Sequence, residues 1–292
     1  MQRQALGRDP GLTTRMAVAL VLLACTYLGL VAGCAFLIGY RAQYVWWWLA
    51  AFAAIAISLS TRYRNGGRTI LESLGVAIAP ATRGSGLGDV IERLAALAEI
   101  PVPDVRVAET DAMNALAVGL RRRRSTVVVT HGLVRALTDS ELEAVLAHEI
   151  SHLANRDAAV MTAVSAPRTL GEVVVGGAGQ GFGLIWMVGW PLGIVPLGLG
   201  TGLTLTVSRY REFAADRGSA LLTGAPEQLM SALQKISAHA AEIPHEDLRV
   251  ANAFCIASTE ARRFALFSDH PPLEKRLEAL AEIAREMGKP VA

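Results

Sequence analysis

The sequence predicts a mainly α-helical protein with a small β-sheet, an α+β fold that belongs to an integral membrane protein. Hydrophobic residues make up 52% of the 292-residue chain, and the mean hydropathy of +0.36 is high for a soluble domain. Two stretches, 16–40 and 173–207, contain no charged residue. Elsewhere apolar residues recur at helical spacing, while the β-branched run at 126–130 is typical of a buried strand.

The N-terminal part, residues 1–68, is expected to form a transmembrane hairpin. The stretch 16–40 is long enough to cross a hydrocarbon core of roughly 30 Å, and a second apolar stretch at 45–60 follows after a short loop. Tryptophans at 46–48 fit an interfacial belt, and arginines flank both outer ends of the hairpin. The positive-inside rule therefore places both ends in the cytoplasm.

An alternative stays open at Cys34. The sequence Val31-Ala32-Gly33-Cys34 resembles a lipoprotein cleavage box, and processing there would leave the remainder of the chain outside the cytoplasm. A lipidated cysteine usually precedes a polar tether, whereas this chain stays apolar after Cys34 and soon enters a second membrane-length stretch. The hairpin is the favoured interpretation.

The motif His148-Glu149-x-x-His152 carries the strongest functional signal. Thr138 and Glu141 form a capping-box pattern that begins a helix, and histidines four positions apart lie on one face of it. Both imidazoles can then reach one Zn²⁺, while Glu149 stays free beside the open position of the metal. A purely structural zinc site would use cysteines and would not need Glu149. The motif predicts a zinc peptidase in which Glu149 takes a proton from an activated water.

A third ligand is expected at Glu212, with Asp216 one helical turn later on the same face. By themselves these acids fit surface ion pairs with neighbouring arginines. Beside the HExxH motif they fit a His₂Glu site for one zinc per chain, in which Asp216 accepts the free ring N–H of a ligating imidazole. These residues predict a zincin-type (gluzincin) catalytic domain.

The catalytic domain is expected in two parts, 69–167 and 208–292, separated by a second hydrophobic hairpin at 168–207. The first part should contain a connector at its start, then a helix and short strands. The uncharged stretch between the parts is short for two full crossings of about 20 residues each, so tilted, broken or re-entrant helices are all open. Because the ligands lie on both sides of it, the stretch must cross twice or not at all. A helix is expected at 90–98, and strands are expected at 105–108, 116–120 and 126–130.

Four motifs together resemble the HtpX family of bacterial membrane-bound zinc metallopeptidases, which is related to the eukaryotic CAAX prenyl endopeptidases. They are the segment 114–119 (NALAVG), the HExxH helix, the segment 208–216, and His270-Pro271-Pro272 with Arg276. Judged alone, His270 would be a residue of a loop or of a helix start, and Arg276 would be a solvated residue on a helix. The resemblance implies that His270 and Arg276 reach the activated water or the developing oxyanion. It also implies a substrate cleft lined by Asn114, Ala115, Leu116 and Ala117.

The sequence therefore leads to a multi-pass zinc endopeptidase of the plasma membrane, with about four hydrophobic segments and its active site facing the cytoplasm. Protein or peptide substrates would lie extended along an edge strand, and the resemblance implies a role in membrane-protein quality control. The alternatives are a specific CAAX-type processing peptidase and a non-enzymatic metal-dependent membrane sensor or scaffold. A net charge of +2, from scattered basic residues, argues against nucleic-acid binding.

Overall fold

The computed structural model describes residues 78–80, 86–121, 124–178, 184–242 and 271–289, with a few isolated helical positions nearer the N-terminus. The predicted N-terminal hairpin, apart from those positions, lies outside the described residues, as do Cys34 and His270. Within the described part of the chain, no helix has both the length and the hydrophobicity needed to cross a membrane.

The chain divides into two compact units, each described here by itself. One unit comprises residues 1–66 and 160–210, and the other comprises 67–159 and 211–292. The second unit contains the HExxH motif and all the described residues predicted for the site. The division into four domain segments made from the sequence stays a prediction.

The second unit contains a four-stranded sheet with the strand order β1-β2-β4-β3. Strands β2 and β4 run parallel, while the β1–β2 and β3–β4 pairs are antiparallel. Among the described strands β3 therefore lies at an edge, and Arg121 at its end pairs with Arg124 at the start of β4. The three predicted strands are confirmed, but β1 was expected to be part of a connector. The strands are β1 (Ile78–Pro80), β2 (Asp104–Ala108), β3 (Ala115–Arg121) and β4 (Arg124–Thr130).

Strand β4 is the inner strand that the apolar run predicts. Val127, Val128 and Val129 are fully buried, so side chains on both faces of the strand are covered. Helix α4 (His131–Ala136) follows directly, because Thr130 Oγ1 accepts a hydrogen bond from the backbone N–H of Leu133 at 3.3 Å and caps the helix.

Helix α5 (Asp139–Asn155) carries the HExxH motif, and the predicted capping box is confirmed. The backbone N–H of Glu141 donates to Thr138 Oγ1 at 3.3 Å, and Glu141 Oε2 accepts from the backbone N–H of Thr138 at 2.9 Å. The helix is buried along almost its whole length. It ends at Asn155; the next residue, Arg156, is in the left-handed region with φ 58°, and α6 (Asp157–Val164) follows directly.

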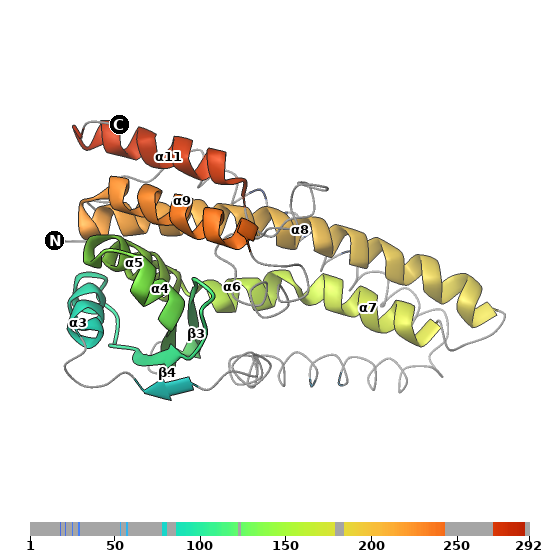
Figure 1. Cartoon of the computed structure of the whole chain (residues 1–292). Coiled ribbons are helices and arrows are strands. Elements are labelled where there is room, and N and C mark those ends of the chain that lie inside the picture. Colours follow the sequence, from blue (N-terminus) through green and yellow to red (C-terminus); the bar gives the residue numbers. More distant parts are fainter. Residues whose placement is uncertain are drawn as a thin grey trace. The chain divides into compact units, whose positions relative to one another are not determined.

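Helix α5 lies between the sheet and α9, and α11 packs against the other side of α9 (Figure 1). Helix α3 packs against α5 and the sheet, and it is the helix predicted at 90–98. One continuous hydrophobic core joins these elements, so the motif helix is held rigidly from several sides. The helices are α3 (Leu87–Leu97), α9 (Pro226–Glu242) and α11 (Leu273–Glu286).

The C-terminal part of helix α8 (Leu184–Thr223) packs closely against α5. A Cβ atom at Gly218 would lie 2.4 Å from Ser151 Oγ and 2.7 Å from Ser151 Cβ, so only glycine permits this approach. Ser219 Oγ donates to the carbonyl of Ala144 at 2.6 Å. These contacts bring the acids of α8 to the face of α5 that carries the histidines.

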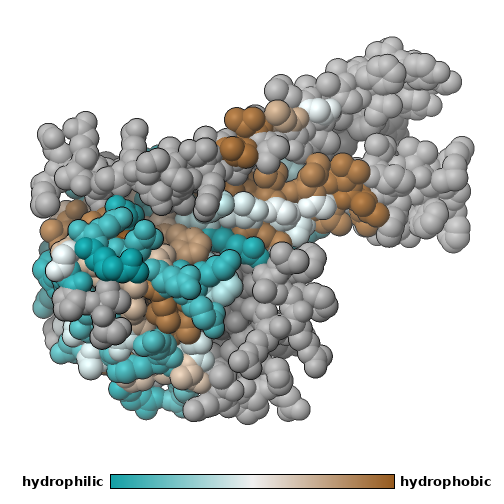
Figure 2. Space-filling view, turned by 90° about the horizontal axis from the view of Figure 1, so that it is seen from above, coloured by the Kyte–Doolittle hydropathy of each residue, from teal (hydrophilic) through white to brown (hydrophobic). Residues whose placement is uncertain are grey.

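The first unit contains α7 (Ala166–Ala178) and the N-terminal part of α8, so the uncharged stretch forms two helices in its described residues. Their backbones approach closely, since a Cβ at Gly200 would lie 2.3 Å from the backbone nitrogen of Arg168. Pro167 lies in the first turn of α7, where its missing N–H costs nothing. Hydrophobic side chains gather on part of the surface in Figure 2. On α8, Ile194 and Val195 are exposed.

Candidate metal and catalytic site

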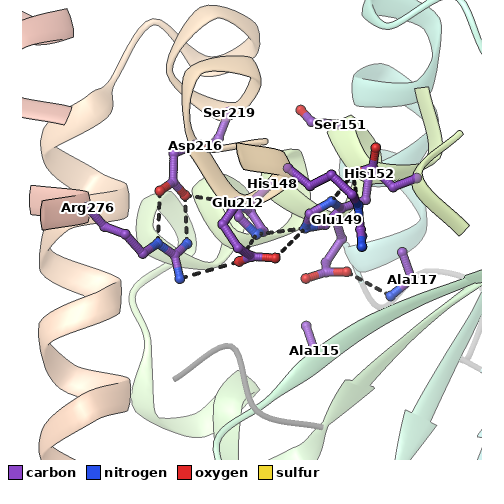
Figure 3. A network of polar contacts seen from close by, with 12 residues as sticks. Ala115, Ala117, His148, Glu149, Ser151, His152, Glu212, Asp216, Ser219 and Arg276 are labelled. Carbon is purple, nitrogen blue, oxygen red and sulfur yellow. Dashed lines mark hydrogen bonds and ion pairs between the residues drawn. The ribbon is translucent and has the colours of Figure 1, made fainter. Parts of the chain in front are cut away.

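His148 and His152 of α5 converge with Glu212 of α8 (Figure 3). The two Nε2 atoms lie 3.1 Å apart, and each lies 3.6 Å from an oxygen of the Glu212 carboxylate. One donor atom from each residue fits within 4.8 Å of the others. The structure thus brings together the three residues predicted as ligands.

This cluster fits a metal ion by the chemistry of its donors. Two imidazole nitrogens and one carboxylate oxygen form a His₂Glu set, which is a donor combination typical of catalytic zinc. All three side chains are buried or nearly so, with exposed fractions of 1%, 12% and 5% for His148, His152 and Glu212. Each imidazole turns Nε2 into the cluster because a carboxylate occupies the Nδ1 side of its ring.

The carboxylate behind His148 belongs to Asp216, as predicted. His148 Nδ1 lies 3.0 Å from Asp216 Oδ1. Arg276 of α11 donates to both oxygens of this carboxylate, with Nη2 at 2.6 Å and Nε at 2.8 Å. Arg276 Nη1 also lies 3.6 Å from Glu212. We call His148, Asp216 and Arg276 the inner network; their side chains are at most 2% exposed.

Burial and mutual attraction oppose each other in the inner network. Burial by itself lowers the pKa of His148, but the contacts with Asp216 and Glu212 raise it more, to about 9. Burial raises the pKa of the Asp216 carboxyl, yet Arg276 and His148 outweigh this and hold the pKa below its ordinary value. Burial lowers the pKa of Arg276, and Asp216 and Glu212 reverse that effect. The buried charges therefore stabilise one another.

The carboxylate behind His152 belongs to Asp157, the first residue of α6, which the sequence analysis did not single out. His152 Nδ1 lies 2.5 Å from Asp157 Oδ2, and Arg211 Nε of α8 lies 3.1 Å from the same oxygen. We call His152, Asp157 and Arg211 the outer network. Its side chains are 12%, 7% and 20% exposed, so it lies nearer the solvent than the inner network. The signal in the sequence is an acid five residues after the second histidine.

Glu149 lies between the ligand cluster and strand β3 (Figure 3). Its Oε2 accepts a hydrogen bond from the backbone N–H of Ala117 at 2.7 Å. Burial raises the pKa of Glu149, and the positive charge of His152 and His148 opposes the rise only in part. A carboxylate with a raised pKa is a stronger base than an exposed glutamate.

The residues predicted to line a substrate cleft lie at the start of β3 and along it. Asn114 is buried, its Oδ1 accepts from the backbone N–H of Ala115 at 2.8 Å, and its backbone N–H donates to Thr130 Oγ1 at 2.9 Å. Ala115 is buried in the core, whereas Leu116 and Ala117 are half-buried. Arg276 was expected to be a solvated residue by pattern alone, and that expectation is wrong, because Arg276 is fully buried against Asp216.

An HExxH helix in a mostly helical fold with a small sheet, joined to a buried glutamate from a second helix, defines a metallopeptidase. The model of peptidase family M48 matches residues 82–284. The chain belongs to peptidase family M48, whose members are in general zinc-dependent. The predicted enzyme class, a metalloendopeptidase acting on proteins or peptides, is therefore confirmed.

Comparison with individual proteins confirms the predicted HtpX resemblance. The chain is 40% identical to "Protease HtpX homolog" of Moorella thermoacetica, with 98% of each chain covered. It is 38% identical to "Protease HtpX homolog 2" of Methanosarcina acetivorans, over 96% of this chain and 98% of the relative. The crystal structure of S. mikatae Ste24p matches 93% of this chain and 66% of its own, with a TM-score of 0.50 and 18% identity. This last likeness supports the fold alone.

Proposed function

We propose that the protein is a zinc endopeptidase in which His148, His152 and Glu212 bind one Zn²⁺ and Glu149 is the general base. The convergence of the three donor atoms within 4.8 Å is the observation that carries this proposal. Bound zinc would supply Lewis-acid polarisation of the scissile carbonyl and of a water molecule.

The chain's own residues move the proton. Glu149 is placed beside the ligand cluster and has a raised pKa, so its carboxylate can accept a proton from water and return it to the leaving amine. The hydrogen bond from Ala117 keeps the carboxylate oriented between the cluster and the edge strand. His270 is proposed, from the resemblance alone, to contact the developing oxyanion. Arg276 contacts Asp216 and Glu212, and we propose that these contacts also position the metal ligands.

The substrate is proposed to bind as an extended strand beside β3. In the described part of the chain, β3 has a strand neighbour on one side only, so its other edge can pair with a peptide backbone. Asn114, Ala115, Leu116 and Ala117 would form this part of the cleft. Pairing through backbone atoms tolerates many side chains, which suits the quality-control role that the HtpX resemblance implies.

The enzyme is further proposed to be anchored in the plasma membrane with its site facing the cytoplasm. The uncharged stretches and the arginine distribution of residues 1–68 support this topology. Cysteines introduced one at a time at Gln43 and at the exposed Ser140, in a chain that keeps Cys34 but lacks Cys25 and Cys255, can be labelled on intact cells with an impermeant reagent. The chain that carries Cys34 alone gives the background. Labelling is expected at Gln43 and not at Ser140. Labelling at Ser140 would instead favour lipidation at Cys34.

The catalytic assignment is tested by separating metal binding from proton transfer. Glu149→Gln removes the base but none of the ligands, so peptide cleavage should fall about 10²- to 10⁴-fold while zinc content stays near one per chain. His148→Ala or Glu212→Ala should lose both zinc and activity. Zinc is measured by atomic emission beside a cleavage assay on detergent-solubilised protein.

Glu143→Gln provides the matched control, because Glu143 lies on the same helix and pairs with Arg93 at 2.9 Å, outside the ligand cluster. It should keep both zinc and activity. A Glu149→Gln protein that cleaves at the wild-type rate would reject the assigned base. Full zinc content in Glu212→Ala would show that another residue is the third ligand.

A further inference from the structure

Asp157 occupies a position that the catalytic assignment leaves unused. It is 5% exposed, and Oδ2 lies 2.5 Å from Nδ1 of His152. The left-handed backbone of Arg156 turns the chain at the end of α5, so that Asp157 returns toward the last turn of that helix. A buried carboxylate this close to an imidazole selects which ring nitrogen carries the proton.

The orientation of His152 depends on such a partner. An imidazole can rotate about its bond to Cβ, and either nitrogen can then face the ligand cluster. With Nδ1–H directed to Asp157, Nε2 is the atom that lies 3.1 Å from Nε2 of His148 and 3.6 Å from Glu212. The carboxylate also increases the basicity of the nitrogen on the other side of the ring.

Arg211 completes the arrangement from a third element. Its Nε lies 3.1 Å from Asp157 Oδ2, and it immediately precedes Glu212 in α8. The ion pair therefore links the residue behind His152 to the helix that supplies the third ligand. His152, Asp157 and Glu212 are in this way fixed relative to one another from α5, α6 and α8.

We propose that Asp157 is a positioning residue that orients His152 for metal binding, and that Arg211 holds Asp157 in place. The inference rests on the proposed zinc site. It assigns no contact with substrate to either residue. Its consequence is that zinc affinity depends on an acid outside the ligand set, which lies behind His152 as Asp216 lies behind His148.

The experiment compares Asp157→Ala and Asp157→Asn with Glu143→Gln in the full-length, detergent-solubilised chain. Zinc affinity is measured by competition with a chromophoric chelator. The tautomer and hydrogen bonding of His152 are measured from ¹⁵N chemical shifts of labelled histidines after treatment with excess chelator. A substitution that only loosened the fold would lower the unfolding temperature in chelator without selectively changing the His152 shifts.

Asp157→Ala should weaken zinc binding about 10- to 100-fold, a typical effect for a residue that orients a ligand. Asp157→Asn retains an acceptor oxygen and should recover part of the affinity, while Glu143→Gln should match the wild type. Altered ¹⁵N shifts of His152 in Asp157→Ala are also expected.

Wild-type zinc affinity in Asp157→Ala, or unchanged His152 shifts, would overturn the proposal. If Asp157→Ala does not fold, the same two criteria apply to Asp157→Asn. A wild-type chain that takes up no zinc would reject the proposed function. The ¹⁵N shifts of His152, measured in chelator, would still show whether Asp157 orients the imidazole.

Discussion

The inner and outer networks use the same chemistry in different surroundings. In each, a histidine of the HExxH helix faces an aspartate, and an arginine faces that aspartate from the other side. The inner side chains are at most 2% exposed, whereas those of the outer network are 7–20% exposed. The networks therefore differ in solvent access and in the arginine contact, since Arg276 donates to both oxygens of Asp216 whereas Arg211 lies near one oxygen of Asp157.

Solvent access decides what each network contributes. A buried charge that loses its partner cannot recover the lost interaction from water, so breaking a buried pair costs about 3–5 kcal/mol. A partly exposed pair is screened and typically contributes up to about 1 kcal/mol. The inner network should thus govern folding as well as ligand geometry, while the outer network should govern ligand geometry with little effect on folding.

The largest effect is expected from Arg276→Met, which leaves Asp216 buried beside His148 without its bidentate partner. The free energy of unfolding should fall by about 3–5 kcal/mol, measured by denaturant unfolding in excess chelator so that bound metal does not contribute. Arg93→Met is the control, because Arg93 forms an exposed pair with Glu143 and should change stability by less than about 1 kcal/mol. Equal stability of the two variants would remove the basis for distinguishing the networks.

A second prediction concerns the helix contact on which both networks depend, since Asp216 and Arg211 both come from α8. Gly218→Ala places a methyl group 2.4 Å from Ser151 Oγ, and overpacking of this kind costs about 1–3 kcal/mol. Zinc affinity should fall as well, because Glu212 moves with α8. Adding Ser151→Gly removes the clashing atoms and should restore both properties. A double variant as impaired as Gly218→Ala would show that the contact does not set the approach of the helices.

A third prediction separates charge burial from metal binding, using a carboxylate on the same helix outside the site. Glu141 accepts from Lys235 Nζ at 2.7 Å and from Ser231 Oγ at 2.6 Å. Burial raises the pKa of Glu141, but these hydrogen bonds and those from Thr138 outweigh it and lower the pKa from 4.5 to about 2. Because the folded pKa is depressed, the stabilisation is complete above about pH 4.5 and is lost as the pH falls toward about 2.

Glu141→Gln should therefore cost about 1–2 kcal/mol at neutral pH. The difference from wild type should shrink over that acidic range, as followed by denaturant unfolding at several pH values. Both proteins share the same metal site, so its own acid sensitivity cancels in the difference. A gap that stays constant from neutral pH to about pH 2 would contradict the assignment of the stabilisation to the ionised carboxylate.

The smallest effect on stability is expected from Arg211→Met. The Arg211 side chain is 20% exposed, so water can replace part of its interaction with Asp157, and the free energy of unfolding in chelator should fall by about 1 kcal/mol. Comparison with Arg276→Met under identical conditions tests the contrast between the networks directly. If Arg211→Met loses more free energy of unfolding than Arg276→Met, the predicted difference between the two networks is wrong.

Local patterns in the sequence account for most of the fold and for the ligand cluster. The HExxH spacing, the capping box at Thr138 and the β-branched run of β4 each depend on neighbours a few residues away, and each is confirmed in the structure. Glu212 and Asp216 could be selected because they lie one turn apart on a helix and follow a motif that lacks a third ligand.

The missed features depend on contacts or backbone angles that residue types do not specify. Asp157 reaches His152 because Arg156 adopts a left-handed conformation, which is uncommon for arginine. Arg276 lies 60 positions from Asp216, so its burial results from the packing of α11. Strand β1 has only three residues and is a strand because β2 lies beside it.

In the described part of the chain one edge of β3 has no strand neighbour, and such an edge would also offer a template to a second copy of the protein or to any partly unfolded chain, since unpaired backbone groups favour intermolecular strand pairing and aggregation. Two features oppose this. The N–H of Ala117 is already bonded to Glu149, and in the sequence β3 leads into four consecutive arginines, 121–124, whose charge repels an identical chain. An extended chain can pair at Ala117 only by displacing Glu149. The carboxylate that is proposed to accept a proton from water thus also occupies one backbone donor of the edge, at Ala117.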